Sequence, residues 1–147
     1  MNSPGDRLGL VARQVTKVYE LEKARIEVLR GVDAEVHPGE TVSIMGASGA
    51  GKSTLLHTLG SLDHPTSGTV TLDGEDLYKA AASRRNELRA TVFGFVFQAF
   101  HLLPELDVLD NVILPALSRR GALRRRESIR ERGRELLTAV GLGHRMN

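Results

Sequence analysis

Residues 46–53 of this 147-residue chain read Gly-Ala-Ser-Gly-Ala-Gly-Lys-Ser, which matches the pattern G-x-x-x-x-G-K-[ST]. The preceding segment, Thr41–Met45, is short, mostly apolar and rich in β-branched residues, as is typical of a strand buried on both faces. The following segment places leucines at helical spacing, namely Leu55, Leu56, Leu59 and Leu62. A glycine-rich turn between a strand and a helix predicts a loop that surrounds phosphate groups. The pattern therefore predicts an α/β nucleotide-binding fold rather than a simple connecting turn.

Each residue type in this loop has a physical role. Gly46, Gly49 and Gly51 permit backbone torsions that turn successive N–H groups inward around phosphate oxygens. The N-terminus of the helix predicted over Lys52–Leu62 adds partial positive charge at the same point. We expect the Lys52 ammonium to reach the β- and γ-phosphates and the Ser53 hydroxyl to ligate Mg²⁺. The expected phosphate-binding set is Gly46, Ala47, Ser48, Gly49, Ala50, Gly51, Lys52, Ser53 and Thr54.

Composition excludes several other classes of protein. The chain has no cysteine, which removes disulfides, thiolate catalysis and cysteine-ligated metals. The longest stretch without a charge, Ala90–Pro104, has 15 residues, fewer than the ~20 that span a bilayer. The first seven residues lack the apolar core of an export signal. These features predict a soluble, intracellular domain.

The residues from Arg119 to Arg134 hold eight arginines and two glutamates, a local charge of +6. Such a run can mark a nucleic-acid or membrane-surface patch. Its spacing favours the solvated face of a helix, because Glu127–Arg130 and Glu131–Arg134 are i,i+3 pairs. The opposite face would hold Ile129, Gly133, Leu136, Leu137 and Val140. We therefore expect no nucleic-acid partner.

The remaining elements follow from periodicity and turn signals. Alternation predicts a strand over Ile26–Val36, which ends in a turn at His37-Pro38-Gly39. A short strand, Thr69–Leu72, leads into an Asp73-Gly74 hairpin turn. A helix capped by Ser83 is expected to run toward Thr91, followed by a second buried strand, Val92–Phe97. Asp107 is the predicted N-cap of a helix whose apolar stripe is Val108, Leu109, Val112, Ile113, Ala116 and Leu117.

Hydrolysis of a nucleotide would need acidic residues that hold Mg²⁺ and orient water, one of them at the end of a buried strand. The strand predicted over Val92–Phe97 ends in Gln98 instead, and Asp73 belongs to a hairpin turn. We therefore expect this chain by itself to bind ATP without turnover. Two alternatives stay open: a small-molecule kinase with a lid formed by Arg119–Arg134, and a nucleotide-binding module without catalysis.

Three motifs carry a resemblance to a known family: the loop Gly46–Thr54, the triplet Val96-Phe97-Gln98, and the leucine- and glycine-containing segment Leu55–Gly68. Together they resemble an ABC transporter ATP-binding subunit. The run Gly94–Pro104, with Asn111-Val112 and Pro115, is similar to the lipoprotein-releasing (Lol-type) and macrolide-exporting (Mac-type) subfamily. The resemblance extends from about Leu8 to the last residue.

The resemblance implies an ABC-type nucleotide-binding domain that is incomplete at its C-terminus. An antiparallel β subdomain and a RecA-like P-loop core would occupy about residues 1–98, and the start of a helical subdomain residues 99–147. Tyr19 would stack on adenine, and Gln98 would reach Mg²⁺ and the attacking water. The strand that the family places centrally would be missing, leaving Thr41–Met45 or Val92–Phe97 with an unpaired edge.

The same resemblance implies what the complete subunit does. ATP and Mg²⁺ would be its cofactors, and ATP binding and hydrolysis would be coupled to export or lipoprotein release. Its partners would be membrane subunits, which dock a coupling helix beside Phe100–Leu117, and a second ATP-binding subunit across the nucleotide. The subunit would be peripheral, at the cytoplasmic face of the inner membrane.

Overall fold

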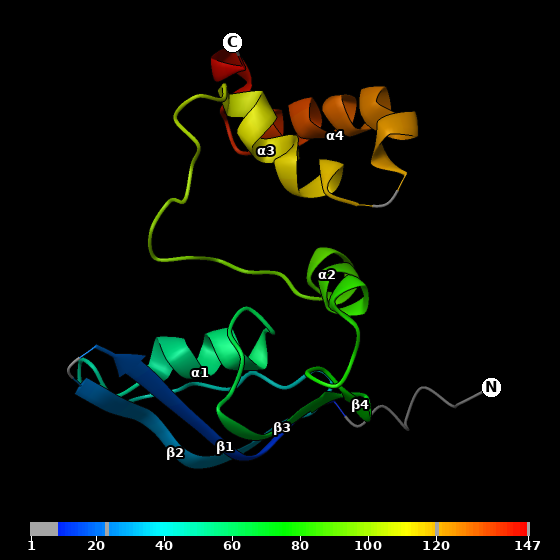
Figure 1. Cartoon of the computed structure of the whole chain (residues 1–147). Helices are drawn as coiled ribbons and strands as arrows, with labels where there is room; N and C mark the ends of the chain where they lie inside the picture. The colour runs from blue at the N-terminus through cyan, green and yellow to red at the C-terminus, as the bar shows by residue number, and fades with distance from the viewer. Residues whose placement is uncertain (1–8, 23, 120, 147) are drawn as a thin grey trace. The chain divides into compact units, whose positions relative to one another are not determined.

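The computed structural model describes residues 9–22, 24–119 and 121–146, which form two compact units divided between Asn86 and Glu87 (Figure 1). Unit 1 holds the strands β1 (Leu10–Leu21), β2 (Ala24–Val36), β3 (Ser67–Leu72) and β4 (Glu75–Asp76), and the helix α1 (Lys52–Leu59). The helix α2 (Ala82–Thr91) crosses the division. Unit 2 holds α3 (Val108–Leu117), α4 (Arg126–Ala139) and the short 3₁₀ helices Ala122–Arg125 and Gly143–Arg145.

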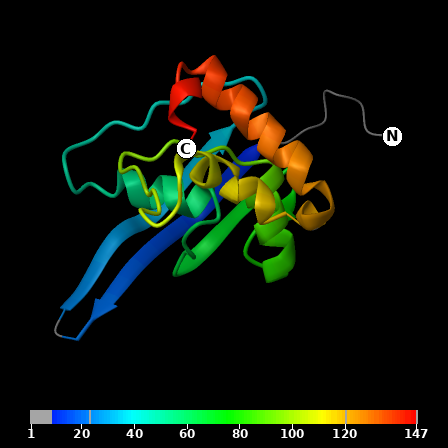
Figure 2. The same cartoon turned by 90° about the horizontal axis from the view of Figure 1, so that it is seen from above.

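The four strands of unit 1 form one antiparallel sheet in the order β2-β1-β3-β4. The long β1–β2 hairpin pairs Leu10 with Val36 at its open end, and Figure 2 shows it from above. The predicted Asp73-Gly74 turn is confirmed: both residues have positive φ, +49° and +83°, and they join β3 to β4. A two-residue hairpin turn whose twist matches the right-handed twist of its strands requires positive φ at both of its central residues.

The helix α1 lies on one face of this sheet (Figure 1). It buries Leu55, Thr58 and Leu59, and the sheet contributes the buried side chains Ala12, Val15, Leu29 and Val70. The predicted helix over Lys52–Leu62 is thus confirmed, but it ends three residues early. The reason is local, because Gly60 is its C-cap and Ser61 adopts a left-handed φ of +58°.

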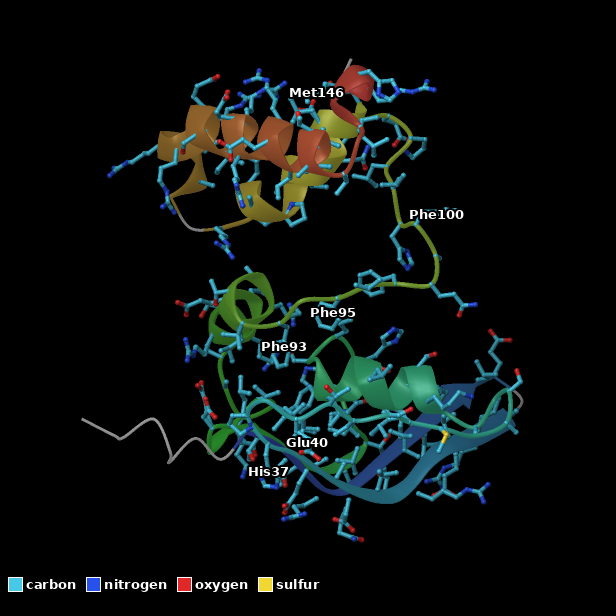
Figure 3. The ribbon with its side chains drawn as sticks, turned by 180° about the vertical axis from the view of Figure 1, so that it is seen from behind. His37, Glu40, Phe93, Phe95, Phe100 and Met146 are labelled. Carbon is cyan, nitrogen blue, oxygen red and sulfur yellow. The ribbon has the colours of Figure 1, made fainter. Side chains whose placement is uncertain are left out.

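The strand predicted over Thr41–Met45 is wrong, because this segment has no regular secondary structure. The turn before it is as predicted: the Glu40 amide donates to the His37 carbonyl at 3.0 Å, and the two side chains are labelled in Figure 3. Met45 is 88% exposed, and within the described residues no strand pairs with this segment. β-Branched residues favour a strand only where neighbouring strands supply hydrogen bonds and packing, so the segment stays irregular.

The second buried strand, predicted over Val92–Phe97, is also wrong. The segment is irregular after α2 ends at Thr91, and Val96 is fully exposed. Its phenylalanine rings contact one another instead. The rings of Phe93 and Phe95, both labelled in Figure 3, lie 6.1 Å apart between centroids, and those of Phe95 and Phe97 lie 5.7 Å apart. We expected one of these two strands to have an unpaired edge. In the described part of the chain, neither segment pairs with a neighbouring strand.

Unit 2 is built on the packing of α3 against α4. The predicted cap is confirmed, since the Asp107 carboxylate accepts a hydrogen bond from the Asp110 amide at 2.6 Å. Leu109 and Ile113 of α3 pack with Leu137 of α4 in a small buried core. Gly133 lies at the contact, where a Cβ atom would come within 2.5 Å of Ile113 Cγ2, so only glycine lets the helices approach this closely.

Of the arginine-rich segment, Arg126, Arg130, Arg132 and Arg134 lie on α4, where they are exposed or half-buried; this agrees with the predicted solvated helix face, with two differences. Arg134 pairs with Glu131 at 3.2 Å, but Arg130 reaches Asp110 of α3 at 2.7 Å rather than Glu127. The apolar stripe is narrower than predicted, because Leu136 and Val140 are exposed. Within the described residues, no helix combines the length and apolar character that crossing a membrane requires.

Candidate nucleotide-binding site

The loop predicted to bind phosphate begins with a tight turn over Ala47–Ala50. The Ala50 amide donates to the Ala47 carbonyl at 3.2 Å, and Gly49 has a φ of +78°. A positive φ at the third position is the geometry of a type II turn, which favours glycine. The Ala50 N–H, expected to face phosphate, is used inside this turn.

Gly51 joins the turn to α1 and acts as the helix N-cap, with a φ of +88°. A Cβ atom here would lie 2.9 Å from Val28 Cγ1 and 3.0 Å from the Val28 carbonyl oxygen on β2. Glycine is therefore required for two independent reasons, the left-handed torsion and the close approach of the sheet. This contact fixes where α1 begins relative to β2.

The Lys52 side chain folds back over the loop that precedes it. Its ammonium donates to the Gly46 carbonyl at 3.0 Å and to the Ala47 carbonyl at 2.7 Å. The charge therefore lies beside the turn and beside the start of α1. This is the position from which an ammonium can bond a phosphate oxygen held by the loop.

The first turn of α1 is suited to an anion. It carries no acidic side chain, and no side chain caps its N-terminus. The first amide groups of a helix lack acceptors within the helix, and the helix dipole makes this end positive. Phosphate groups bind readily at such an end.

Ser53 lies in this first turn, and its side chain is exposed. Mg²⁺ in nucleotide sites is usually bound by one or two protein groups together with substrate phosphates and waters. A single exposed hydroxyl beside the phosphate loop fits that role. Within the described ranges, no group of three or more histidine, cysteine, aspartate or glutamate residues could hold a metal ion without such a substrate.

Tyr19 is on β1, and its hydroxyl donates to Asp63 Oδ2 at 2.7 Å. The Asp63 hydrogen bond and burial raise the pKa of Tyr19, while a hydrogen bond with the Thr54 side chain opposes the shift. Thr54 lies in the first turn of α1, so the structure brings Tyr19 and the phosphate loop together within unit 1. Its predicted stacking on adenine stays a prediction.

Gln98 is exposed in the irregular segment of unit 2, whereas the phosphate loop belongs to unit 1. Its predicted contact with Mg²⁺ and water therefore also stays a prediction. Asn111, near this segment in the sequence, fixes its C-terminal part. The Asn111 side chain donates to the carbonyls of Leu103, Leu106 and Asp107, and accepts from the Leu103 amide at 2.9 Å.

Sequence reasoning missed Lys17 and Asp63, which surround Tyr19. Lys17 is only 9% exposed, and its ammonium bonds both Asp63 Oδ1 and the His64 carbonyl at 2.6 Å. Burial disfavours the charged form of Asp63, but the hydrogen bonds from Lys17 and Tyr19 outweigh it and lower the pKa of the carboxyl. One feature of the sequence could have indicated this pair. Lys17 is two positions from Tyr19, so both side chains lie on the same face of the strand, and a buried lysine needs an acidic partner.

Comparison with known proteins settles the family. The sequence model of the family described as ABC transporter matches residues 29–147. The chain belongs to this family. The lipoprotein-releasing system ATP-binding protein LolD 2 of Caulobacter vibrioides is 46% identical over 94% of this chain and 59% of its own length. LolD of Bordetella pertussis is 48% identical over 99% of this chain and 62% of its own length.

Solved structures agree with this assignment of the fold. The bacterial ABC transporter cassette MJ0796, in a dimeric structure, superposes with a TM-score of 0.76 at 40% identity. The match covers 88% of this chain and 56% of that cassette. A second structure of the same cassette, described as post-hydrolysis, is bound to ADP and Pi. The predicted ABC-type nucleotide-binding fold is confirmed, and the chain spans about 60% of the LolD relatives it matches.

Proposed function

We propose that this chain is the phosphate-binding part of an ATP-binding subunit of an ABC transporter that releases lipoproteins. The observation that carries the proposal is the Lys52 ammonium, held over Gly46 and Ala47 at the start of α1. Membership in the ABC transporter family supports ATP as the ligand. The LolD relatives support lipoprotein release rather than another transport task.

Within this proposal, ATP binds with Mg²⁺. The amides at the start of α1 and the Lys52 ammonium hold the phosphates, and the Ser53 hydroxyl is the protein ligand of the metal ion. Tyr19 stacks on the base, and Gln98 contacts the metal ion and the attacking water. Mg²⁺ neutralises charge on the β- and γ-phosphates when it is bound.

The proposal extends to the partners of the complete subunit. Two such subunits enclose ATP between them, which the dimeric structures of a related cassette support. Membrane subunits dock against the segment Phe100–Leu117, and the assembly lies at the cytoplasmic face of the inner membrane. The names of the LolD relatives, ATP-binding proteins of a releasing system, support a subunit that works with others.

Isothermal titration calorimetry with Mg-ATP tests the central step. We expect binding by the chain and a loss of about 10–100-fold in Lys52→Ala, since a hydrogen bond to a charged group contributes about 1.5–3 kcal/mol. Lys79→Ala is the matched control, because it also removes a lysine ammonium, one that is 82% exposed and lies 3.3 Å from Asp76 Oδ2. Equal affinities for both variants would show that the Lys52 ammonium does not bind phosphate.

A further inference from the structure

Three side chains meet at the end of β1 that leads toward the β1–β2 turn. The Asp63 carboxylate receives a hydrogen bond from Lys17 on one oxygen, at 2.6 Å, and from the Tyr19 hydroxyl on the other, at 2.7 Å. The Lys17 ammonium also lies 4.8 Å from the centroid of the Tyr19 ring. Each of the three side chains therefore contacts the other two.

This arrangement fixes the Tyr19 ring at both ends. At one end, the Tyr19 backbone belongs to the paired strand β1. At the other end, the Tyr19 hydroxyl donates to the Asp63 carboxylate, and a charged acceptor forms a stronger hydrogen bond than a neutral one. The Lys17 ammonium occupies one face of the ring, so only the opposite face is available for stacking. Tyr19 is nevertheless 37% exposed, which leaves ring surface for a ligand.

The ring also lies beside the phosphate loop. The helix α1 contacts β1, and the Thr54 side chain, in the same first turn of α1 as Lys52 and Ser53, lowers the pKa of the Tyr19 hydroxyl. A nucleotide whose phosphates lie at this helix end would extend its base from there. A ring held in one orientation binds a base with a smaller loss of side-chain entropy than a mobile ring does.

We propose that Lys17 and Asp63 are positioning residues that hold the Tyr19 ring as a platform for the base of the bound nucleotide. This inference rests on the proposed function. In this proposal, Lys17 and Asp63 contribute to binding of the base, whereas residues 46–54 bind the phosphates.

A purely structural role for the cluster makes a different prediction. Lys17 also bonds the His64 carbonyl, so the cluster fastens the segment after α1 to β1. If that were its sole purpose, loosening it would weaken the binding of every ligand of the loop to the same degree. A platform for the base affects only ligands that carry a base.

The test compares Mg-ATP with Mg-tripolyphosphate, which has the phosphates but no base, on the 147-residue chain. Base stacking on an aromatic ring contributes about 5–150-fold to affinity. A ring that keeps its place but is less firmly held should lose affinity by a factor near the lower end of this range. We expect Tyr19→Phe, which keeps the ring and removes its hydroxyl, to weaken Mg-ATP about fivefold and Mg-tripolyphosphate by less than about twofold. Asp63→Ala should do the same.

The double variant Tyr19→Phe/Asp63→Ala gives the sharper readout. If Asp63 acts through the hydroxyl, the double variant loses no more base-dependent affinity than either single variant. Tyr78→Phe is the matched control, since that hydroxyl donates to the main-chain oxygens of Thr58 and Asp63 at 2.5 Å. We expect it to change both ligands' affinities by the same factor.

The outcomes separate the two proposals. The positioning role would be overturned if Tyr19→Phe and Asp63→Ala lowered the affinities for Mg-ATP and Mg-tripolyphosphate by the same factor. It would also be overturned if the losses of base-dependent affinity in the two single variants added up in the double variant. Equal affinity of the unmodified chain for Mg-ATP and Mg-tripolyphosphate would also overturn it, while leaving the phosphate loop in place. Failure of the unmodified chain to bind either compound would instead refute the proposed function, and this inference with it.

Discussion

Two glycines of the phosphate loop offer a matched pair of substitutions. Gly49 and Gly51 have nearly the same left-handed φ, +78° and +88°. A Cβ atom added at Gly49 meets no atom within 4 Å, whereas one at Gly51 lies 2.9 Å from Val28 Cγ1 and 3.0 Å from the Val28 carbonyl oxygen. Both alanine variants carry the torsional strain, but only Gly51→Ala adds a collision with β2.

The magnitudes follow from these two contributions. A left-handed residue with a Cβ costs about 1–2 kcal/mol, and the smaller conformational freedom of the unfolded alanine chain returns about 0.4–1 kcal/mol. Gly49→Ala should therefore lower the free energy of unfolding by about 1 kcal/mol. The collision at Gly51 adds about 1–3 kcal/mol, because the Val28 carbonyl belongs to a paired strand and cannot move alone.

Urea denaturation followed by circular dichroism at 222 nm measures the two losses, and hydrogen exchange in α1 and β2 shows where they arise. We expect Gly51→Ala to unfold at clearly lower urea concentration than Gly49→Ala and to raise exchange in both elements. It should also bind Mg-ATP more weakly, because relief of the collision moves the start of α1. Equal urea midpoints for the two variants would refute the argument that close packing against Val28 fixes the loop.

Gly133→Ala should lower the free energy of unfolding by about 1 kcal/mol, since overpacking against Ile113 by about 1–3 kcal/mol exceeds the gain of about 1 kcal/mol in helix propensity. Gly94→Ala, with no atom within 4 Å of the added Cβ, is its control in the same urea titration, and equal midpoints would contradict the packing argument. Asp107→Ala should lower the free energy of unfolding by about 1 kcal/mol through loss of the helix cap, and an unchanged midpoint would show that the cap is dispensable. The pKa of Asp63 is lower in the folded chain, so its contribution to stability is complete above about pH 4 and is lost as the pH falls through the folded pKa. Asp63→Asn should therefore lose less stability than the unmodified chain between pH 6 and pH 3, and an identical loss would show that Asp63 does not contribute.

Elements fixed by local chemistry could be predicted from the sequence. The Asp73-Gly74 turn depends on two residues that tolerate positive φ, and the Asp107 cap depends on one carboxylate at a helix start. The conformation of residues 46–52 is equally local, because the glycines and Lys52 are close in sequence and the Lys52 ammonium bonds the Gly46 and Ala47 carbonyls; the binding of phosphate there stays a prediction. In each case the residues that determine the conformation lie within a few positions of one another.

Features that depend on distant neighbours could not be predicted in this way. Thr41–Met45 has the composition of a buried strand, but composition does not reveal whether a neighbouring strand is present to pair with it. Arg130 had a partner available at i−3 on its own helix, yet it pairs with Asp110 of α3. The Lys17–Asp63 pair joins a strand to a segment 46 positions away, and a single sequence carries no direct record of that contact.

The anchoring of the segment after α1 has a consequence for how unit 1 forms. That segment is fastened by Lys17 from one side and by Tyr78 from the other, across 46 and 15 positions of sequence. The entropy of closing both loops must be overcome before the far end of α1 acquires a fixed place. The fixed position of the far end of α1 therefore depends on contacts between segments that are distant in the sequence, and not on the glycine-rich motif by itself.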